Sequence, residues 1–212
     1  MPLHGKPRGI PLGRLPSPSG PLAAVAERAR FLRSFALHPR QVGAILPTSQ
    51  RTARAMLDLA PVERAACVVE LGAGTGPITG EVLRRLGPDG RMLAFEVDPV
   101  LATALAERFP DPRLQVITDS AERLEEHLDG RRPEVIVSAL PFTSLPGDVG
   151  KRILQLASRV LADDGAMVVL QYSLFLQRDL RRIFGSVERH VSPLNVPPAM
   201  LFLCRPGGAR AA

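Results

Sequence analysis

Tryptophan is absent from this chain of 212 residues, and there is a single tyrosine. Aromatic residues make up 4% of the chain, which is little material for stacking on nucleic-acid bases. The two cysteines, Cys67 and Cys204, lie in apolar runs, so we expect buried free thiols. Cysteine and histidine do not cluster with the spacing of metal ligands, and we therefore expect no metal.

Long apolar runs are also missing, since none approaches the roughly 18 residues that a membrane-spanning helix needs. The first twenty residues are rich in proline, glycine and basic residues and lack the apolar segment of a signal peptide. These absences favour a cytoplasmic protein whose contact with a membrane is peripheral. We expect it to be a monomer.

Acidic residues are scarce near the N-terminus. Residues 1–60 hold nine lysines and arginines but two acidic residues, a net charge of +7, whereas the whole chain carries +6. The remainder is therefore close to neutral. A basic segment beside a neutral body suggests a partner with phosphates, either nucleic acid or an anionic membrane surface, although a solubilising tail would look the same.

The N-terminal region divides into a tail and two helical segments. Repeated proline predicts that residues 1–20 are disordered. Apolar residues at helical spacing predict an amphipathic helix over 21–39. A second helix is predicted over 48–60, with Thr48 or Ser49 as its N-cap.

Residues 63–205 alternate short β-branched runs with helical patterns, as in a doubly wound α/β domain. Strands that are apolar on both sides predict a mostly parallel sheet with helices on both faces. Two final strands without a helix between them predict a closing antiparallel pair, which makes seven strands. Residues 206–212 are expected to be flexible. The predicted strands are Cys67–Leu71, Met92–Glu96, Leu114–Thr118, Val135–Ala139, Met167–Tyr172, Val187–Val191 and Ala199–Cys204, with helices over 77–86, 100–108, 120–128, 148–161 and 175–184.

The strongest motif is a glycine-rich turn that follows the first predicted strand. Gly72, Gly74 and Gly76 are spaced G-x-G-x-G, and Pro77 stands where a dinucleotide-binding fingerprint needs glycine. With Glu70 two residues ahead, the turn resembles motif I of S-adenosylmethionine-dependent methyltransferases. The resemblance implies a Rossmann-like class I fold, S-adenosyl-L-methionine as cofactor and S-adenosyl-L-homocysteine as product. It also implies that Glu70 acts on the cationic methionine end of the cofactor.

Two further strand ends carry acidic residues. Glu96 ends the second predicted strand, where a carboxylate can accept hydrogen bonds from both ribose hydroxyls. Asp98 competes for that role, although its position favours capping of the next helix. Asp119 and Ser120 follow the third strand, where the same family has an acidic residue that meets the adenine amine. Both residues can also cap the following helix.

The fourth predicted strand ends in Ser138-Ala139-Leu140-Pro141-Phe142. Methyltransferases of adenine or cytosine amino groups carry Asp/Asn-Pro-Pro-Tyr/Phe there, which holds a weakly nucleophilic amine and stacks on the base. Here Ser138 replaces the amide or carboxylate, Leu140 intervenes and Phe142 remains. An aliphatic amine needs only deprotonation and alignment, so this ending favours an aliphatic acceptor.

Several stretches together resemble the bacterial phospholipid N-methyltransferases, a small soluble type related to the rRNA adenine dimethyltransferases. The resemblance implies successive methylation of phosphatidylethanolamine toward phosphatidylcholine, with anionic membrane as partner. It also implies that helices within residues 21–62 bind the membrane and cover the active site. The matching stretches are Phe31–Phe35, Gly43–Ser49, Val69–Gly76, Ser138–Phe142 with Leu145-Pro146, and Asn195–Ala199.

The resemblance also assigns individual roles. It implies that Thr48, Ser49 and Leu140 contact the cofactor and that Ser138 serves both cofactor binding and catalysis. Arg33 and Phe142 are expected to contact the lipid substrate.

Two features of the last third of the chain have two interpretations each. Tyr172, at the end of the fifth strand, is predicted to bind the amine or to face the methylammonium with its ring, but a core tyrosine fits equally. Arg178, with Arg181 and Arg182, either holds the lipid phosphate or belongs to a solvated helix face.

Other functions fit less well. An RNA adenine dimethyltransferase would share the fold and the basic N-terminus, but Ser138 and the few aromatic residues argue against nucleic acid as substrate. The glycine spacing argues against a nicotinamide enzyme. A scaffold without catalysis is opposed by the intact glycines and Glu96.

Overall fold

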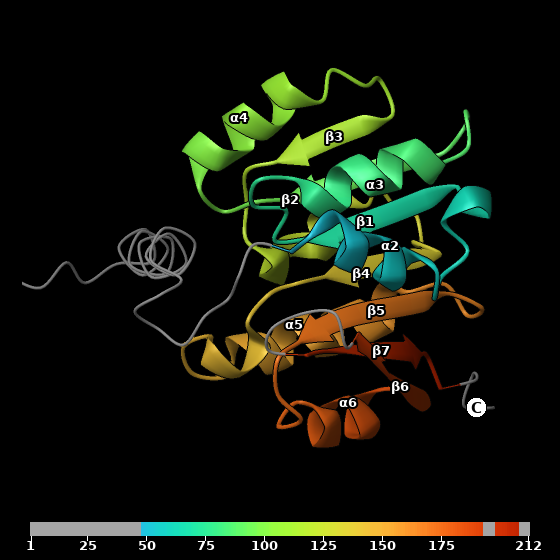
Figure 1. Cartoon of the computed structure of the whole chain (residues 1–212), viewed down its shortest axis with the longest axis vertical. Helices are drawn as coiled ribbons and strands as arrows, with labels where there is room; N and C mark the ends of the chain where they lie inside the picture. The colour runs from blue at the N-terminus through green and yellow to red at the C-terminus, as the bar shows by residue number, and fades with distance from the viewer. Residues whose placement is uncertain (1–47, 193–197, 208–212) are drawn as a thin grey trace, which may run out of the picture.

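The computed structural model describes residues 48–192 and 198–207, and within them seven strands form one sheet. The strand order is β3-β2-β1-β4-β5-β7-β6 (Figure 1). The predicted tail 1–20, the predicted helix 21–39 with Arg33, and most of the predicted C-terminal tail lie outside the described residues. The strands are β1 (Cys67–Leu71), β2 (Arg91–Phe95), β3 (Leu114–Ile117), β4 (Val135–Ser138), β5 (Ala166–Gln171), β6 (Ser186–Ser192) and β7 (Ala199–Arg205).

The first five strands are parallel to one another. Val69 of β1 pairs with Leu93 on one side and with Ile136 on the other, and all five residues of β1 are buried. Burial on both faces is what a near-continuous apolar run in a parallel sheet requires. β7 runs antiparallel to both of its neighbours, β5 and β6. The predicted seven-stranded, mostly parallel sheet with a closing antiparallel pair is therefore confirmed.

Helices cover both faces of the sheet. Figure 1 shows α2 and α3 in front of the sheet and α5 behind it. Two apolar clusters result, one under α2, α3 and α4 and the other under η2, η3, α5 and α6. The helices are α2 (Gln50–Leu57), η1 (Val62–Arg64), α3 (Pro77–Arg85), α4 (Pro99–Arg108), η2 (Ala121–His127), η3 (Phe142–Ser144), α5 (Val149–Val160) and α6 (Gln177–Ile183).

Helix α2 is shorter than the predicted helix 48–60 and is part of the core. Ser49 is its N-cap, since the side-chain oxygen accepts a hydrogen bond from the N–H of Thr52 at 3.1 Å. Met56 and Leu57 on its apolar face are at most 1% exposed and pack in the cluster shared with α3 and the sheet. This face is therefore not available to a membrane, which differs from the expectation that helices across 21–62 share a membrane-binding role.

The segment predicted as a helix over 120–128 is a 3-10 helix with a break at Arg123, whose φ and ψ are not helical. The helices predicted over 77–86, 100–108, 148–161 and 175–184 are confirmed within a few residues at their ends. Both cysteines are buried free thiols, as expected, and burial raises the pKa of Cys67 to about 11 and that of Cys204 to about 12.

Among the described residues, no helix has both the length and the apolar character to cross a bilayer. The same residues contain no group of three or more His, Cys, Asp or Glu side chains that could hold a metal ion.

Candidate cofactor and acceptor site

The carboxyl ends of β1, β2, β4 and β5 meet at one edge of the sheet, on the left in Figure 1. Ligands of open α/β sheets bind at this edge because the strand order reverses there and leaves a gap between the connections. In this sheet the reversal lies between β1 and β4. Helix α2 begins at the same edge, which places Thr48 and Ser49 there (Figure 1).

The glycine-rich turn after β1 is held by the backbone of β2. The N–H groups of Gly72 and Ala73 both donate to the carbonyl of Phe95, each at 2.9 Å. Gly72, Gly74 and Gly76 all have positive φ, which side chains disfavour. At Gly72 a Cβ would also lie 2.5 Å from Cδ2 of Leu140, so the loop after β4 comes close to the backbone here.

Glu96 ties the end of β2 to this turn. Its carboxylate accepts hydrogen bonds from the N–H of Gly74 at 2.8 Å and from the N–H of Asp98 at 2.9 Å. Burial raises the pKa of Glu96, and the backbone N–H groups partly oppose that shift. Asp98 caps α4, since its Oδ1 accepts hydrogen bonds from the N–H groups of Val100 and Leu101. Of the two candidates for the ribose, Glu96 is therefore the one that faces the glycine turn.

Glu70 is 1% exposed and lies beneath the turn. One of its carboxylate oxygens accepts a hydrogen bond from the Thr79 hydroxyl of α3 at 2.5 Å. The other, Oε1, is buried without a hydrogen-bond partner among the described residues. Burial raises the pKa of Glu70 to about 8, although the hydrogen bond from Thr79 lowers it. A cationic ligand near this carboxyl group would favour its ionised form.

Asp119 follows β3 and contacts three neighbours. Its oxygens bond to the N–H of Ser120 at 2.7 Å and to Nε2 of His127 at 2.9 Å, and Arg123 lies 3.4 Å away. Burial opposes ionisation, but these partners prevail and the pKa of Asp119 lies below its ordinary value. Ser120 is the N-cap of η2, with its hydroxyl 3.2 Å from the N–H of Glu122. Ser120 therefore takes the predicted capping role, and Asp119 faces the same edge as Glu96.

Ser138 is fully buried and links two loops of the site. Its hydroxyl donates to the carbonyl of Leu71 at 3.1 Å and accepts from the N–H of Leu140 at 3.2 Å. Gln171 at the end of β5 holds the same loop from the other side, because its Nε2 donates to the carbonyl of Leu140 at 2.7 Å. The hydroxyl hydrogen of Ser138 is thus used within the protein, which suits a positioning role better than proton transfer.

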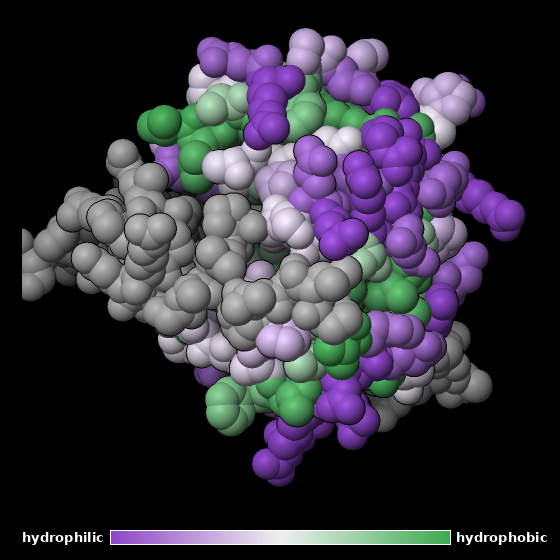
Figure 2. Space-filling model, viewed as in Figure 1, coloured by the Kyte–Doolittle hydropathy of each residue, from purple (hydrophilic) through white to green (hydrophobic). Residues whose placement is uncertain are grey.

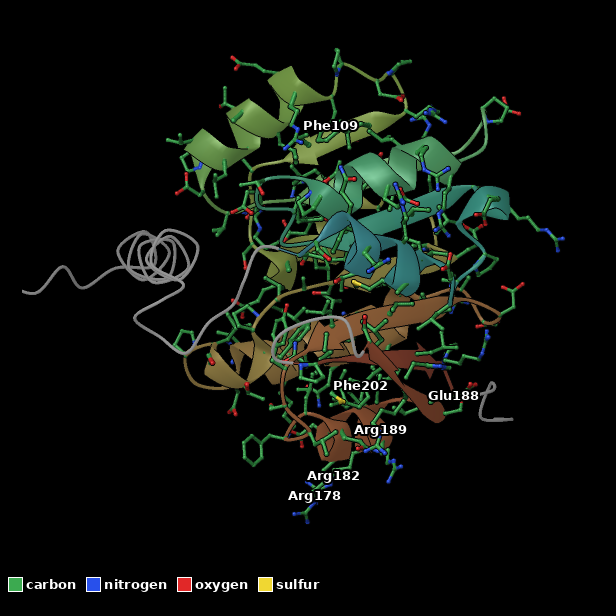
Figure 3. All side chains as sticks on the ribbon, in the orientation of Figure 1. Phe109, Arg178, Arg182, Glu188, Arg189 and Phe202 are labelled. Atoms are coloured by element: carbon green, nitrogen blue, oxygen red, sulfur yellow. The ribbon has the colours of Figure 1, made fainter. Side chains whose placement is uncertain are left out.

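Not every predicted acceptor-binding residue reaches this edge. Phe142 is 5% exposed and packs in the cluster under α5, so its ring has no open face for a ligand. Arg178 is exposed on α6, and its side chain points away from the helix into solvent at the bottom of Figure 3. Tyr172 is half-buried just beyond β5, and burial raises the pKa of its hydroxyl. Tyr172 is the one of these three that lies at the strand ends.

Three contributors were missed at the level of sequence. Thr79 holds Glu70, Gln171 holds the Leu140 loop, and His127 pairs with Asp119. Gln171 carried a usable signal, because it is a polar residue at the end of a fully buried apolar strand. Thr79 and His127 lie on amphipathic helical segments, and the sequence alone does not reveal which side chain each of them hydrogen-bonds.

The residues present fit S-adenosylmethionine. The unpartnered oxygen of Glu70 suits the cationic methionine end, and the Glu96 carboxylate has lone pairs beyond those that accept backbone N–H groups, which suits the ribose hydroxyls. Asp119 stands beyond β3 in the position expected for the adenine amine. The individual contacts of these residues with the cofactor stay predictions.

Comparisons with known proteins agree with this geometry. A family model described as a methyltransferase domain matches residues 68–165. The solved structure of N-methyltransferase NodS from Bradyrhizobium japonicum WM9, in complex with S-adenosyl-L-homocysteine, superposes with a TM-score of 0.67. It is 14% identical and the match covers 84% of this chain and 98% of that chain, which shows a shared fold.

Among curated relatives, ornithine lipid N-methyltransferase from Singulisphaera acidiphila is 34% identical over 180 residues, which is 82% of this chain and 94% of the relative. Ribosomal RNA small subunit methyltransferase A from Nocardia farcinica is 33% identical over 128 residues, which is 57% of this chain and 43% of that protein. The chain thus spans less than half of this RNA-modifying relative.

This protein is an S-adenosylmethionine-dependent methyltransferase, as the fold, the glycine-rich turn and the carboxylates at the strand ends indicate. Its extended similarity to the Singulisphaera protein is more specific than the domain match. The chain belongs to the family of bacterial lipid N-methyltransferases.

Proposed function

We propose that this protein methylates the amine headgroup of a membrane aminolipid. The observation that carries the proposal is the ending of β4, where Ser138 is buried in a backbone link and Phe142 is buried in the core. An enzyme for adenine needs an acceptor group beside the amine and an exposed ring that stacks on the base. An aliphatic amine needs neither.

Two lipids are candidates within this class. The Singulisphaera relative is named for ornithine lipid, and the sequence resemblance pointed to phosphatidylethanolamine and its monomethyl and dimethyl forms. Both offer a primary aliphatic amine beside an acidic group. We therefore propose that the substrate is phosphatidylethanolamine or ornithine lipid, and the two should be compared directly.

The chemistry is an in-line displacement in which an amine nitrogen attacks a methyl carbon. S-adenosylmethionine supplies that electrophilic methyl group on its sulfonium. The protein has to align the amine and favour its uncharged form, because an ammonium has no lone pair to donate. Half-buried surroundings at Tyr172 disfavour an ammonium, and its hydroxyl stays protonated because burial raises its pKa. Tyr172 is thus suited to hydrogen bonding with the amine rather than to acting as a charged base.

Peripheral attachment to the cytoplasmic face of the membrane is part of the proposal. The basic N-terminal quarter, with Arg33 and the predicted helix over 21–39, is suited to anionic lipid headgroups. Arg33 and the predicted helix over 21–39 lie outside the described part of the chain.

The test is a competition between three acceptors. Purified protein and methyl-labelled cofactor are incubated with vesicles of phosphatidylethanolamine, with vesicles of ornithine lipid, and with ribosomal RNA. We expect label in one or both lipids, separated by thin-layer chromatography, and none in RNA. Label in RNA but in neither lipid would overturn the proposal.

The second candidate is an rRNA adenine methyltransferase, which the similarity to ribosomal RNA small subunit methyltransferase A favours. Ser138→Asn restores the amide of the adenine-type motif and distinguishes the two. We expect no RNA methylation from this variant, because the buried Phe142 still offers no stacking surface. RNA methylation by Ser138→Asn would show that the acceptor side is built for a base.

A further inference from the structure

Four large apolar side chains stand out as exposed among the described residues, and all lie at the edge where the parallel strands end. Val100 follows β2 and is 62% exposed. Leu174 and Phe175, 47% and 84% exposed, lie in the loop after β5. Val191 is 51% exposed near the end of β6. The opposite edge has no counterpart in the described part of the chain.

Strand register brings three of these side chains to one end of that edge. Gln171 at the end of β5 pairs with Met200 of β7, and Met200 pairs with Val191 of β6. The loop with Leu174 and Phe175 leaves β5 from the same level. Exposed apolar side chains scattered singly are ordinary, but three at one corner of a binding edge indicate a contact surface.

Positive charge lies beside this corner. Leu180 of α6 is buried in the core, whereas Arg178, Arg181 and Arg182 face solvent. Figure 3 shows Arg178 and Arg182 pointing away from α6, with Arg189 of β6 nearby. Figure 2 shows apolar surface by the loop before α6 and hydrophilic surface directly below it. Only Asp179 on this helix is acidic, and it lies 3.9 Å from Arg182.

We propose that this corner docks on a lipid bilayer. Docking would hold the edge where the carboxyl ends of the parallel strands meet, here called the active edge, at the membrane. The docking corner consists of Leu174, Phe175 and Val191, which enter the acyl region, and Arg178, Arg181 and Arg182, which bind anionic headgroups. Apolar side chains flanked by arginine are the pattern of interfacial membrane binding. Val100 lies at the other end of the same edge, on α4, which contains one arginine, Arg108. The proposal rests on the proposed lipid substrate, since docking here brings the strand ends to the lipid amine.

The lack of tryptophan provides a direct test at one residue. Phe175→Trp in the full chain places the sole tryptophan in the docking corner, and Val100→Trp is the matched control with similar exposure at the same edge. With vesicles of phosphatidylethanolamine and phosphatidylglycerol, we expect a blue shift of Phe175→Trp emission and quenching by lipids brominated on the acyl chain. Val100→Trp emission should not change.

Charge is tested by a second pair of variants. Each arginine near a lipid surface contributes roughly fivefold to affinity. Arg178→Ala with Arg182→Ala should therefore weaken vesicle binding by about 25-fold in sedimentation. Arg91→Ala with Arg205→Ala removes the same charge from the opposite edge, where β2 begins and β7 ends, and should leave binding unchanged.

Each result decides one claim. No shift in Phe175→Trp emission while the protein sediments with vesicles, or an equal shift in Val100→Trp, overturns the docking corner. A blue shift without lipid that depends on protein concentration assigns the corner to a second copy of the chain and overturns it as well. Insertion of Phe175→Trp without methylation of either lipid supports docking and refutes the proposed function. Methylation without insertion does the reverse.

Discussion

The two halves of the active edge are built differently. On the β1–β2 half, backbone N–H groups of the glycine turn are fixed by Phe95 and Glu96, and the carboxylates there are buried. On the β4–β5 half, Ser138 and Gln171 hold a loop, and the residues that follow β5 are a half-buried Tyr172 and the exposed apolar Leu174 and Phe175.

The difference is the one expected if the β1–β2 half binds the cofactor and the β4–β5 half binds the lipid amine, as proposed. A soluble, charged cofactor is recognised by a few fixed donors and acceptors, which are effective only when the backbone holds them in place. A lipid amine arrives on a surface that already restricts its position. The β4–β5 half therefore depends more on a loop of fixed conformation and on contact with the lipid surface than on polar groups that recognise the amine.

The largest effect expected on the cofactor half is a pH dependence due to Glu70. Its pKa is about 8 in the folded protein, against an ordinary value of 4.5, so the folded state binds one more proton than the unfolded state between these values. The free energy of unfolding should fall as pH rises through this window, by up to roughly 1.4 kcal/mol per pH unit. Glu70→Gln keeps an acceptor for Thr79 and should flatten that slope in urea titrations at pH 5 to 8.

A slope that is equally steep in Glu70→Gln would show that another group titrates. Glu96, whose pKa is also raised by burial, is the nearest alternative, so Glu96→Gln is the matched control.

The next largest effect is expected at Gly72, where the two halves of the active edge come close together. Gly72→Ala combines a φ of 79° with a Cβ that would lie 2.5 Å from Leu140, so we expect a loss of about 3 kcal/mol of stability. Gly74→Ala meets no atom within 4 Å and should cost only about 1 kcal/mol for its φ of 55°. Thermal unfolding compares the two variants. Equal losses would mean that the contact with Leu140 is unimportant.

A smaller effect concerns cofactor affinity. Glu96→Ala should weaken S-adenosylmethionine binding by about 2 kcal/mol, because the ribose hydroxyls lose a charged acceptor. Asp98→Asn retains the cap of α4 and should bind normally in calorimetric titration. The reverse result would move the ribose contact to Asp98.

The smallest effect separates positioning from catalysis on the acceptor half. Ser138→Ala removes the link between Leu71 and Leu140 and should lower stability by about 1 kcal/mol. We expect KM for the lipid to rise while the pH profile of kcat stays in place, because the hydroxyl transfers no proton. A shifted pH profile would restore a catalytic role for Ser138.

Much of the fold could be predicted from the sequence because apolar runs and helical spacing are local signals. All seven strands were predicted within two residues of their ends. The segment around Arg123 is predicted as one helix but forms a broken 3-10 helix, in which Leu124 still packs in the core.

The candidate site was predictable where a residue's role depends on its backbone position. The glycines and Glu96 follow directly from strand ends, and the structure brings them together. Phe142 and Arg178 were different, since their expected roles depended on the direction of the side chain. A single turn of 3-10 helix directs Phe142 into the core, and no local pattern in the sequence specifies that turn.

The antiparallel strand β7 also affects the order of assembly. It is the last of the described strands, yet it lies between β5 and β6 and hydrogen-bonds to both. Until residues 199–205 have been synthesised, β5 has an open edge and β6 has no neighbour in this sheet. Open strand edges invite pairing with other chains. The nascent protein therefore keeps these strand edges open to pairing with other chains until β7 has been added to the sheet.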